Sequence, residues 1–325
     1  MQPTIMTFKV TEQMRLDAFL TEQLQESRNQ IASLIKNGHV KIGSKRHAKA
    51  GVKLKVGDEV VVTLPILEPK RAQKIDFDVP ILYEDDDILV IDKPTALTVH
   101  PAPSVNEPTL VDWLRHHGVS LSTISAQERH GIVHRLDKGT SGVMVVAKNN
   151  RAHESLSLQL QDKSMGRYYL ALITPPLKDN PTLIDKPIGR SPKNRLKMAI
   201  KEGAKESSTL FTKLLLSHDE RREFIACKLF TGRTHQIRVH LESFSRHIFG
   251  DHLYGIKSNS DKIPRILLHA YILYLRHPST GKTMRFKAEL PSVMVEYLEQ
   301  YFNTKDLDEI LLPDNIYATF SNFHT

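Results

Sequence analysis

The sequence has a single cysteine and no long uninterrupted apolar segment. With only Cys227 among its 325 residues, the chain can form no internal disulfide and no cysteine-ligated zinc site, which excludes a disulfide-stabilised secreted scaffold. No apolar run reaches the roughly 18 residues that a membrane-spanning helix needs. Residues 1–9 also lack the apolar segment and cleavage site of a secretory signal. A reducing cytoplasm is therefore the expected compartment.

Acidic residues are fewer than basic ones. The chain carries 45 Lys and Arg against 37 Asp and Glu, a formal net charge of +8. The excess is uneven: residues 1–65 carry 10 Lys and Arg against 6 Asp and Glu, whereas residues 304–325 carry one Lys against four acidic residues. A basic balance of this kind favours a polyanionic partner, either nucleic acid or an acidic membrane surface.

Residues 1–65 are predicted to form a small α+β domain. Apolar residues recur at helical spacing over 16–24 and over 31–35, and Ser27 is the expected cap of the second helix. Short β-branched runs then surround a turn at Gly57-Asp58. Lysine and arginine crowd the loops between these runs, which is typical either of a solubilising surface or of a surface that binds a polyanion.

This pattern resembles the S4-like RNA-binding domain. The resemblance rests on Arg15-Leu16-Asp17, Ser27-Arg28, Gly38-His39-Val40 and Val56-Gly57-Asp58-Glu59. It implies that the domain binds RNA. The residues expected to contact RNA are Arg28, Lys36, Lys41, Lys45 and Arg46.

The rest of the chain is expected to hold one larger domain. Residues 66–77 lack periodicity and read as a linker, and the acidic segment 304–325 is expected to be an appended tail. Between them, residues 78–303 are predicted to form an α+β fold, a mixed and mostly antiparallel sheet with flanking helices and a central cleft. The strand-like runs lie at 143–147, 168–173, 209–215, 223–230 and 283–289, and the helical patterns at 108–117, 150–162, 234–244 and 291–302.

The run from Gly131 to Lys148 places one carboxylate, Asp137, beside basic residues. Residues 139–142 are predicted to form a turn between strands at 132–133 and 143–146. A charged side chain on a rigid strand–turn–strand frame is a common way to fix a reactive group. Taken alone, however, an Asp in such a segment is more often a simple turn residue.

A second run, Gly232–Leu241, supplies a matching cation. Thr234 is predicted to cap a helix whose apolar face includes Ile237. If Arg238 on this helix reaches Asp137, the guanidinium would keep the carboxylate ionised and oriented. Removing one member of a buried ion pair costs about 3–5 kcal/mol, so such an arginine would also be structural.

A third run, from Gly166 to Ile173, contains two adjacent tyrosines. Strand alternation places Tyr169 on one face and Tyr168 on the other. Tyrosines in a strand usually serve packing. One that faces a pocket can also stack on a planar base while its hydroxyl forms a hydrogen bond.

Taken together and in their order along the chain, the three runs resemble the RluA/RluD-type pseudouridine synthases. The resemblance extends from about residue 12 to 302, and the S4-like domain in front places the chain nearer the RluD-like branch. The matching motifs are His134-Arg135-Leu136-Asp137, Arg167-Tyr168-Tyr169-Leu170-Ala171, Gly232–Leu241, Gly250-Asp251 with Tyr254-Gly255, and Leu268-His269-Ala270.

The resemblance implies an isomerase that detaches uracil from its ribose in RNA, turns it and rejoins it through carbon five. Asp137 would be the nucleophile, and Arg238 would hold it. Tyr169 would stack on the uracil and assist removal of the proton from carbon five. Attack on the ring, attack on the anomeric carbon and protection of a glycal-like intermediate all stay open as routes.

The resemblance also implies contacts to the substrate. His134 and Arg135 would bind RNA, with Arg135 assisting the flipping of the target nucleotide, and Ile237 and Leu268 would line the pocket. Large-subunit ribosomal RNA is the favoured substrate, and transfer RNA is the alternative. No cofactor, metal, membrane contact or obligate protein partner is expected, and the chain is expected to be a monomer.

Two other functions fit part of the pattern. A retaining glycosidase also uses a carboxylate nucleophile, but it needs a second carboxyl group about 5–5.5 Å away. The loop offers one Asp among cations, which argues against that pair. A non-catalytic RNA-binding protein could keep the same fold, but the joint presence of Asp137, Tyr169 and Arg238 favours the enzyme.

Overall fold

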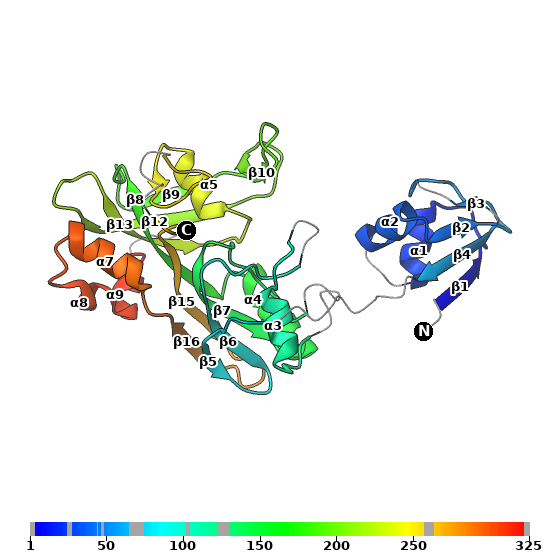
Figure 1. Cartoon of the computed structure of the whole chain (residues 1–325), viewed down its shortest axis with the longest axis horizontal. Coiled ribbons are helices and arrows are strands. Elements are labelled where there is room, and N and C mark those ends of the chain that lie inside the picture. Colours follow the sequence, from blue (N-terminus) through cyan, green and yellow to red (C-terminus); the bar gives the residue numbers. More distant parts are fainter. Residues whose placement is uncertain are drawn as a thin grey trace. The chain divides into compact units, whose positions relative to one another are not determined.

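The computed structural model describes residues 4–24, 28–43, 45–46, 49–64, 75–101, 105–122, 130–256 and 263–321. The chain divides into two compact units, Met1–Gln73 and Lys74–Thr325 (Figure 1). Their boundary falls within the expected linker, of which residues 66–74 lie outside the described residues. In the described part of the chain, no helix is both long and apolar enough to cross a membrane.

The first unit packs two helices against an antiparallel sheet with strand order β1-β4-β2-β3. Its elements are β1 (Thr4–Lys9), α1 (Leu16–Leu24), α2 (Arg28–Lys36), β2 (Val40–Ile42), β3 (Lys45–Arg46) and β4 (Glu59–Leu64). Leu16 and Leu20 of α1 are fully buried together with Ile31 of α2 and Val60 of β4, as the helical spacing predicts. The expected cap Ser27 lies outside the described residues.

The second unit is built on one mixed sheet. Its elements are β5 (Ile81–Glu84), β6 (Ile88–Lys93), α3 (Leu110–His116), β7 (Ser141–Ala147), α4 (Asn150–Gln161), β8 (Gly166–Thr174), β9 (Thr182–Asp185), β10 (Ile188–Arg190), β11 (Met198–Ile200), β12 (Ser208–Leu216), β13 (Glu223–Leu229), α5 (Gln236–Glu242), β14 (His247–Ile248), β15 (Leu268–Arg276), β16 (Thr283–Lys287), α7 (Ser292–Tyr301), α8 (Leu307–Ile310) and α9 (Pro313–Ala318). The strand order is β5-β6-β7-β15-β8-β13-β12-β9, with β14 on β8 and β16 on β15. Among the described strands of this sheet, only β7 and β15 pair in parallel, which confirms the predicted mixed, mostly antiparallel α+β fold.

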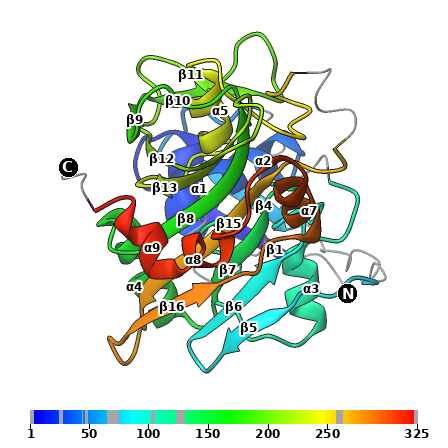
Figure 2. The same cartoon turned by 90° about the vertical axis from the view of Figure 1, so that its left-hand side faces the viewer.

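Alternation along β8 directs its side chains into two different cores. Tyr169 and Ala171 enter a cluster that also holds Trp113 of α3 and Ile237 of α5. Tyr168 enters a second cluster, which is covered by α7, α8 and α9 (Figure 2). The predicted placement of the two tyrosines on opposite faces is therefore confirmed.

The residues after 303 form part of the second core. Leu307 of α8, Ile316 of α9 and Phe320 are buried there beside Tyr168. The prediction of an appended tail is wrong for the described residues 304–321, because their apolar side chains cover one face of the sheet. Acidic residues lie between those apolar positions, and their charge obscured the apolar pattern in the sequence.

The turn predicted at 139–142 lies slightly earlier in the chain, where the N–H of Thr140 donates to the carbonyl oxygen of Asp137, and residues 141–142 already belong to β7. Ser141 and Gly142 pair in parallel with His269 and Ala270 of β15, a strand that the sequence analysis did not predict. Gly142 has a φ of +118°, and an added Cβ would lie 2.1 Å from the carbonyl oxygen of Ala270. This glycine therefore marks a close approach of two strands and not a turn. The expected strand at 132–133 is reduced to one isolated bridge.

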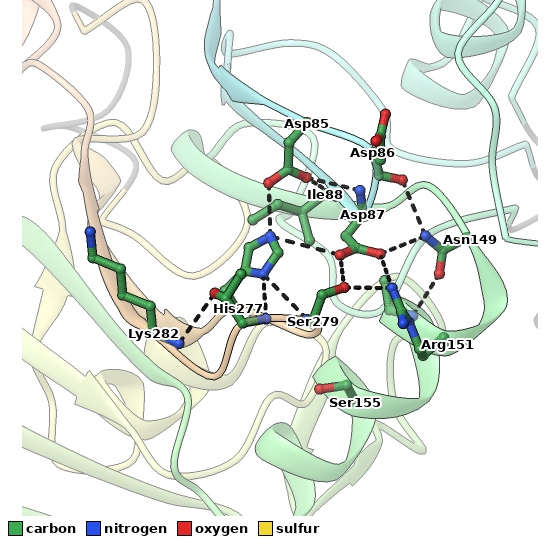
Figure 3. Close-up of polar contacts among 12 residues, drawn as sticks. Asp85, Asp86, Asp87, Ile88, Asn149, Arg151, Ser155, His277, Ser279 and Lys282 are labelled. Atoms are coloured by element: carbon green, nitrogen blue, oxygen red, sulfur yellow. Dashed lines mark hydrogen bonds and ion pairs between the residues drawn. The ribbon is translucent and has the colours of Figure 1, made fainter.

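A polar network joins the turn before β6 to the hairpin between β15 and β16 (Figure 3). Asp85 accepts hydrogen bonds from the Tyr83 hydroxyl, from the N–H groups of Asp87 and Ile88, and from His277 at 2.7 Å. Burial raises the pKa of Asp85, but these donors outweigh it and hold the pKa at about 2. The second carboxylate of the network, that of Asp87, accepts hydrogen bonds from Asn149, Arg151 and Ser279.

Replacing Gly142 by alanine should destabilise the protein far more than the same change at Gly281. Both glycines have a positive φ, but nothing lies within 4 Å of an added Cβ at Gly281, whereas at Gly142 it meets backbone. Urea denaturation should show a loss of about 1 kcal/mol for Gly281→Ala and at least about 3 kcal/mol for Gly142→Ala. Equal losses would contradict the close strand crossing.

Candidate active site

Asp137 lies in a loop that is fixed on both sides. The preceding residue, Leu136, is buried in the main core. On the other side, the N–H of Thr140 donates to the carbonyl oxygen of Asp137, and the hydroxyl of Thr95 donates to the carbonyl oxygen of Gly139 at 2.8 Å. These contacts hold the Asp137 side chain, 18% exposed, at a defined place beside the sheet.

Arg238 of α5 contacts Asp137, as the sequence predicts. Its Nη1 donates to Oδ2 of Asp137 at 3.2 Å. The other N–H groups of the guanidinium bind Asp251, whose carboxylate accepts hydrogen bonds from Nε at 2.7 Å and from Nη2 at 2.8 Å. The ring of Tyr254 lies against it, with its centroid 4.8 Å from Cζ. Held on two sides, the guanidinium presents one N–H group to Asp137 in a fixed direction.

Asp251 and Arg238 keep their charges despite burial. Burial raises the pKa of Asp251, but hydrogen bonds from Arg238 and from the N–H groups of Tyr254 and Leu253 outweigh it, so that the pKa is lowered overall. Burial lowers the pKa of Arg238, but Asp251 and, to a smaller extent, Asp137 raise it above its ordinary value. Sequence reasoning quoted Asp251 within a motif but did not assign it this role.

The helix that carries Arg238 begins differently from the prediction. His235 occupies the N-cap position with a φ of +59°, and no side chain caps the helix, so the expected cap by Thr234 is wrong. The loop is fixed instead by Gln236, whose Oε1 accepts from the N–H of Arg233 at 2.9 Å. Because a side-chain amide both donates and accepts, it can tie a loop to a strand without a capping residue.

The predicted catalytic residues line one narrow cavity. Asp137, Tyr169 and Arg238 border it together with Ile237 and Leu268, as the sequence analysis expected. Its free volume is about 40 Å³, which is small compared with the roughly 300–1,000 Å³ typical of ligand sites. Burial raises the pKa of Tyr169 to about 12, so its phenol is neutral near pH 7.

The two predicted RNA contacts in the loop differ in environment. Arg135 is exposed and borders the same cavity, with Nη1 2.9 Å from Nε2 of His100. His134 is buried, and its Nε2 accepts the N–H of Val145 at 3.1 Å. Burial lowers the pKa of His134 to about 3, so the ring is neutral. Its described contact holds the loop on β7, and the RNA contact at His134 stays a prediction.

The residues of the first unit that we expect to bind RNA lie on α2, β2 and β3. Arg28 begins α2, and Lys36 ends it with an exposed side chain. On the sheet, Lys41 of β2 stands opposite Arg46 of β3 in the register, and Lys45 is exposed.

A buried lysine that the sequence analysis did not select lies behind the loop of Asp137. Lys93, the last residue of β6, is fully buried. Its Nζ donates to the carbonyl oxygens of Pro94 at 2.8 Å and Leu97 at 2.9 Å, and it lies 3.5 Å from that of Lys138. Burial lowers the pKa of Lys93 to about 7, although the charge of Asp137 opposes this.

Comparison with known proteins gives consistent relatives. A family model described as RNA pseudouridylate synthase matches residues 87–243, and a model of the S4 domain matches residues 14–60. A protein of Helicobacter pylori strain J99, named as an uncharacterized RNA pseudouridine synthase, is 47% identical over 317 residues, which cover 95% of this chain and 97% of that protein. Ribosomal large subunit pseudouridine synthase D of Nitrosomonas europaea is 36% identical over 301 residues, covering 89% of this chain and 85% of its own.

Solved structures show the same fold. The structure of human RNA pseudouridylate synthase domain containing 1 has a TM-score of 0.56 and 24% sequence identity, and the match covers 75% of this chain and 97% of that one. Human RNA pseudouridylate synthase domain containing 4 gives a TM-score of 0.52 at 24% identity, covering 68% and 92%. At this identity the likeness is one of fold.

Replacing Lys93 by methionine should remove a pH dependence of stability. Lys93 has a pKa of about 7 in the folded chain and an ordinary value of 10.5, so the unfolded state binds more protons between these two pH values. The free energy of unfolding of the wild type should therefore rise with pH from about 7 to about 10, relative to that of Lys93→Met. Urea denaturation across this range measures the difference. The same change at the exposed Lys193 is the control, and a constant difference for Lys93→Met would contradict the lowered pKa.

Proposed function

The chain belongs to the family of RNA pseudouridine synthases, and from this we propose that it converts specific uridines of large-subunit ribosomal RNA to pseudouridine. The observation that carries the proposal is the contact between Asp137 and Arg238 in a cavity that Tyr169 also borders. The 36% identity to ribosomal large subunit pseudouridine synthase D supports ribosomal RNA as the substrate. Transfer RNA is the alternative.

Asp137 is the proposed nucleophile. The reaction breaks the bond between C1′ of the ribose and N1 of uracil and forms one between C1′ and C5, while C5 loses a proton and N1 gains one. A carboxylate can attack C1′ or the ring, or shield a glycal-like intermediate, from the same position. Arg238 supports each of these routes, because it fixes the direction of the carboxylate with a single N–H group.

Tyr169 and Arg135 are proposed to act on the base. A neutral phenol that borders the cavity suits stacking on uracil and donation of a hydrogen bond, whereas a pKa of about 12 makes it a poor base in its resting state. Extrusion of the target nucleotide from its stack costs a few kcal/mol. Arg135 is exposed beside the cavity, so its side chain is available to contact the position in the RNA stack that the flipped base vacates.

The proposal is tested by mapping pseudouridines in total RNA from cells with and without this protein. Loss of one or more sites in large-subunit ribosomal RNA is the expected result. Loss of sites only in transfer RNA would overturn the substrate assignment. Release of free uracil by the purified protein, in place of an isomerised nucleotide of unchanged mass, would overturn the assignment as an isomerase.

Replacing Asp137 by asparagine should abolish pseudouridine formation and leave RNA affinity nearly unchanged. The amide has the same shape but lacks the nucleophilic oxygen, so the single-turnover rate should fall by at least about a thousandfold. Release of tritium from RNA labelled at C5 of uridine measures this rate. Asp179→Asn, at an exposed position, is the matched control. Turnover near the wild-type rate would show that Asp137 is not the nucleophile.

Replacing Lys36, Lys41 and Lys45 together by glutamine should weaken RNA binding without slowing the chemical step. If each lysine neutralises one phosphate, the slope of log affinity against log salt should fall by about one unit for each lysine lost. The single-turnover rate at saturating RNA should stay within about twofold. Arginine at the same three positions is the control, since it keeps the charge. An unchanged salt slope would remove these lysines from the RNA interface.

A further inference from the structure

A buried arginine, Arg167, lies between the cavity at Asp137 and a larger one beside it. Arg167 is on β8, two residues before Tyr169, and is 7% exposed. Its Nε is buried with no hydrogen-bond partner, and within the described residues its side chain forms no hydrogen bond or ion pair. A buried guanidinium without a counter-charge is unfavourable, so this position favours an anionic ligand.

The larger cavity is strongly cationic. It has a volume of about 540 Å³, within the range of about 300–1,000 Å³ typical of ligand sites. Arg135, Arg167 and Arg233 border both cavities, and Lys163 borders the larger one. Among the described residues, no Asp or Glu lines it. Burial lowers the pKa of Arg167, Tyr169 opposes this shift, and the charge of Arg233 adds to it.

The absence of a side chain at Gly232 makes room for the guanidinium of Arg167. Gly232 borders both cavities, and a Cβ added there would lie 2.5 Å from Nη1 of Arg167. A planar guanidinium with paired N–H groups matches two oxygens of a phosphate. Phe230 adds an aromatic side chain to the lining of the larger cavity, which suits the flat face of a base.

We propose that Arg167 binds a phosphodiester group next to the target uridine, so that the larger cavity holds the neighbouring nucleotide of the RNA. This inference rests on the proposed function, because it places the target nucleotide at Asp137 and the phosphate where the two cavities share their lining. The phosphate supplies the counter-charge that Arg167 lacks. Arg167 is then a binding residue that fixes the register of the strand relative to Asp137.

The test uses a short oligoribonucleotide around the mapped target uridine. In a series of such RNAs, one linkage at a time is replaced by a neutral methylphosphonate, and affinity is measured by fluorescence anisotropy with the full-length chain carrying Asp137→Asn. One linkage adjacent to the target should lower affinity about tenfold or more when neutral. In the additional variant Arg167→Gln, the same replacement should have no further effect, while replacements elsewhere keep theirs. Equal sensitivity in both proteins would overturn the proposal.

Two further variants separate charge recognition from folding. Arg167→Lys keeps the charge and should retain part of the sensitivity to the neutral linkage, and it replaces Arg167→Gln in the comparison if the glutamine variant does not fold. Arg285→Gln, at an arginine paired with Asp314 in an exposed ion pair, should leave the whole series unchanged. Two results for Arg167→Lys would contradict the proposal. One is the same insensitivity to the neutral linkage as in a folded Arg167→Gln variant, and the other is the full sensitivity of the chain with Arg167.

Failure of this inference is distinguishable from failure of the proposed function. If mapping finds no modified uridine, the proposed function fails, and the probe becomes a nine-residue oligouridylate. The slope of log affinity against log salt should then still fall by about one unit in Arg167→Gln and stay unchanged in Arg285→Gln. A slope that does not change in Arg167→Gln would show that Arg167 contacts no phosphate.

Discussion

One guanidinium shared between two carboxylates organises the candidate site. Arg238 binds Asp251 through two short hydrogen bonds of 2.7 and 2.8 Å, and Asp137 through one longer bond of 3.2 Å. The difference matters, because a carboxylate held by two strong charge-assisted bonds would be poorly available to attack a substrate. Asp251 takes over the structural part of the interaction, and among the described residues the Asp137 carboxylate accepts one side-chain hydrogen bond, that from Arg238. The cost of burying the arginine is thus met away from the reactive oxygen.

The sheet brings the remaining groups to this pair through one row of its register. Gly142 of β7 stands opposite Ala270 of β15, and Ala270 stands opposite Tyr169 of β8. The loop of Asp137 leads directly into β7, so the parallel pairing fixes the distance between carboxylate and phenol across three strands. Gly142 permits that pairing, since any side chain there would meet the backbone of β15. The chemistry therefore depends on a packing constraint that contains no reactive group.

Much of this arrangement could be predicted from the sequence, and the failures have physical causes. The period of two in a strand placed Tyr168 and Tyr169 on opposite faces, and the paired motifs led to the contact between Asp137 and Arg238. Lys93 could not be predicted in its role, because its hydrogen-bond acceptors are backbone carbonyls, which every residue carries. The pairing of Gly142 with β15 was missed for a related reason. A glycine beside Ser and Thr is typical of a turn, and only its distant partner in the sheet shows that Gly142 lies in a strand.

A comparison of Arg238 with Arg167 shows why local charge balance is informative where the net charge is not. Arg238 has two carboxylate partners within 3.2 Å, whereas Arg167, buried to a similar degree, has no counter-ion in the described chain. A cation that is already neutralised can orient a reactive group, but it gains little from an incoming phosphate. An unpaired one gains the full interaction, because the desolvation cost was met during folding. The cavity thus divides its positive charge between a part that fixes Asp137 and a part that is still available to RNA, and this division follows from where the acidic residues are placed and not from how many arginines there are.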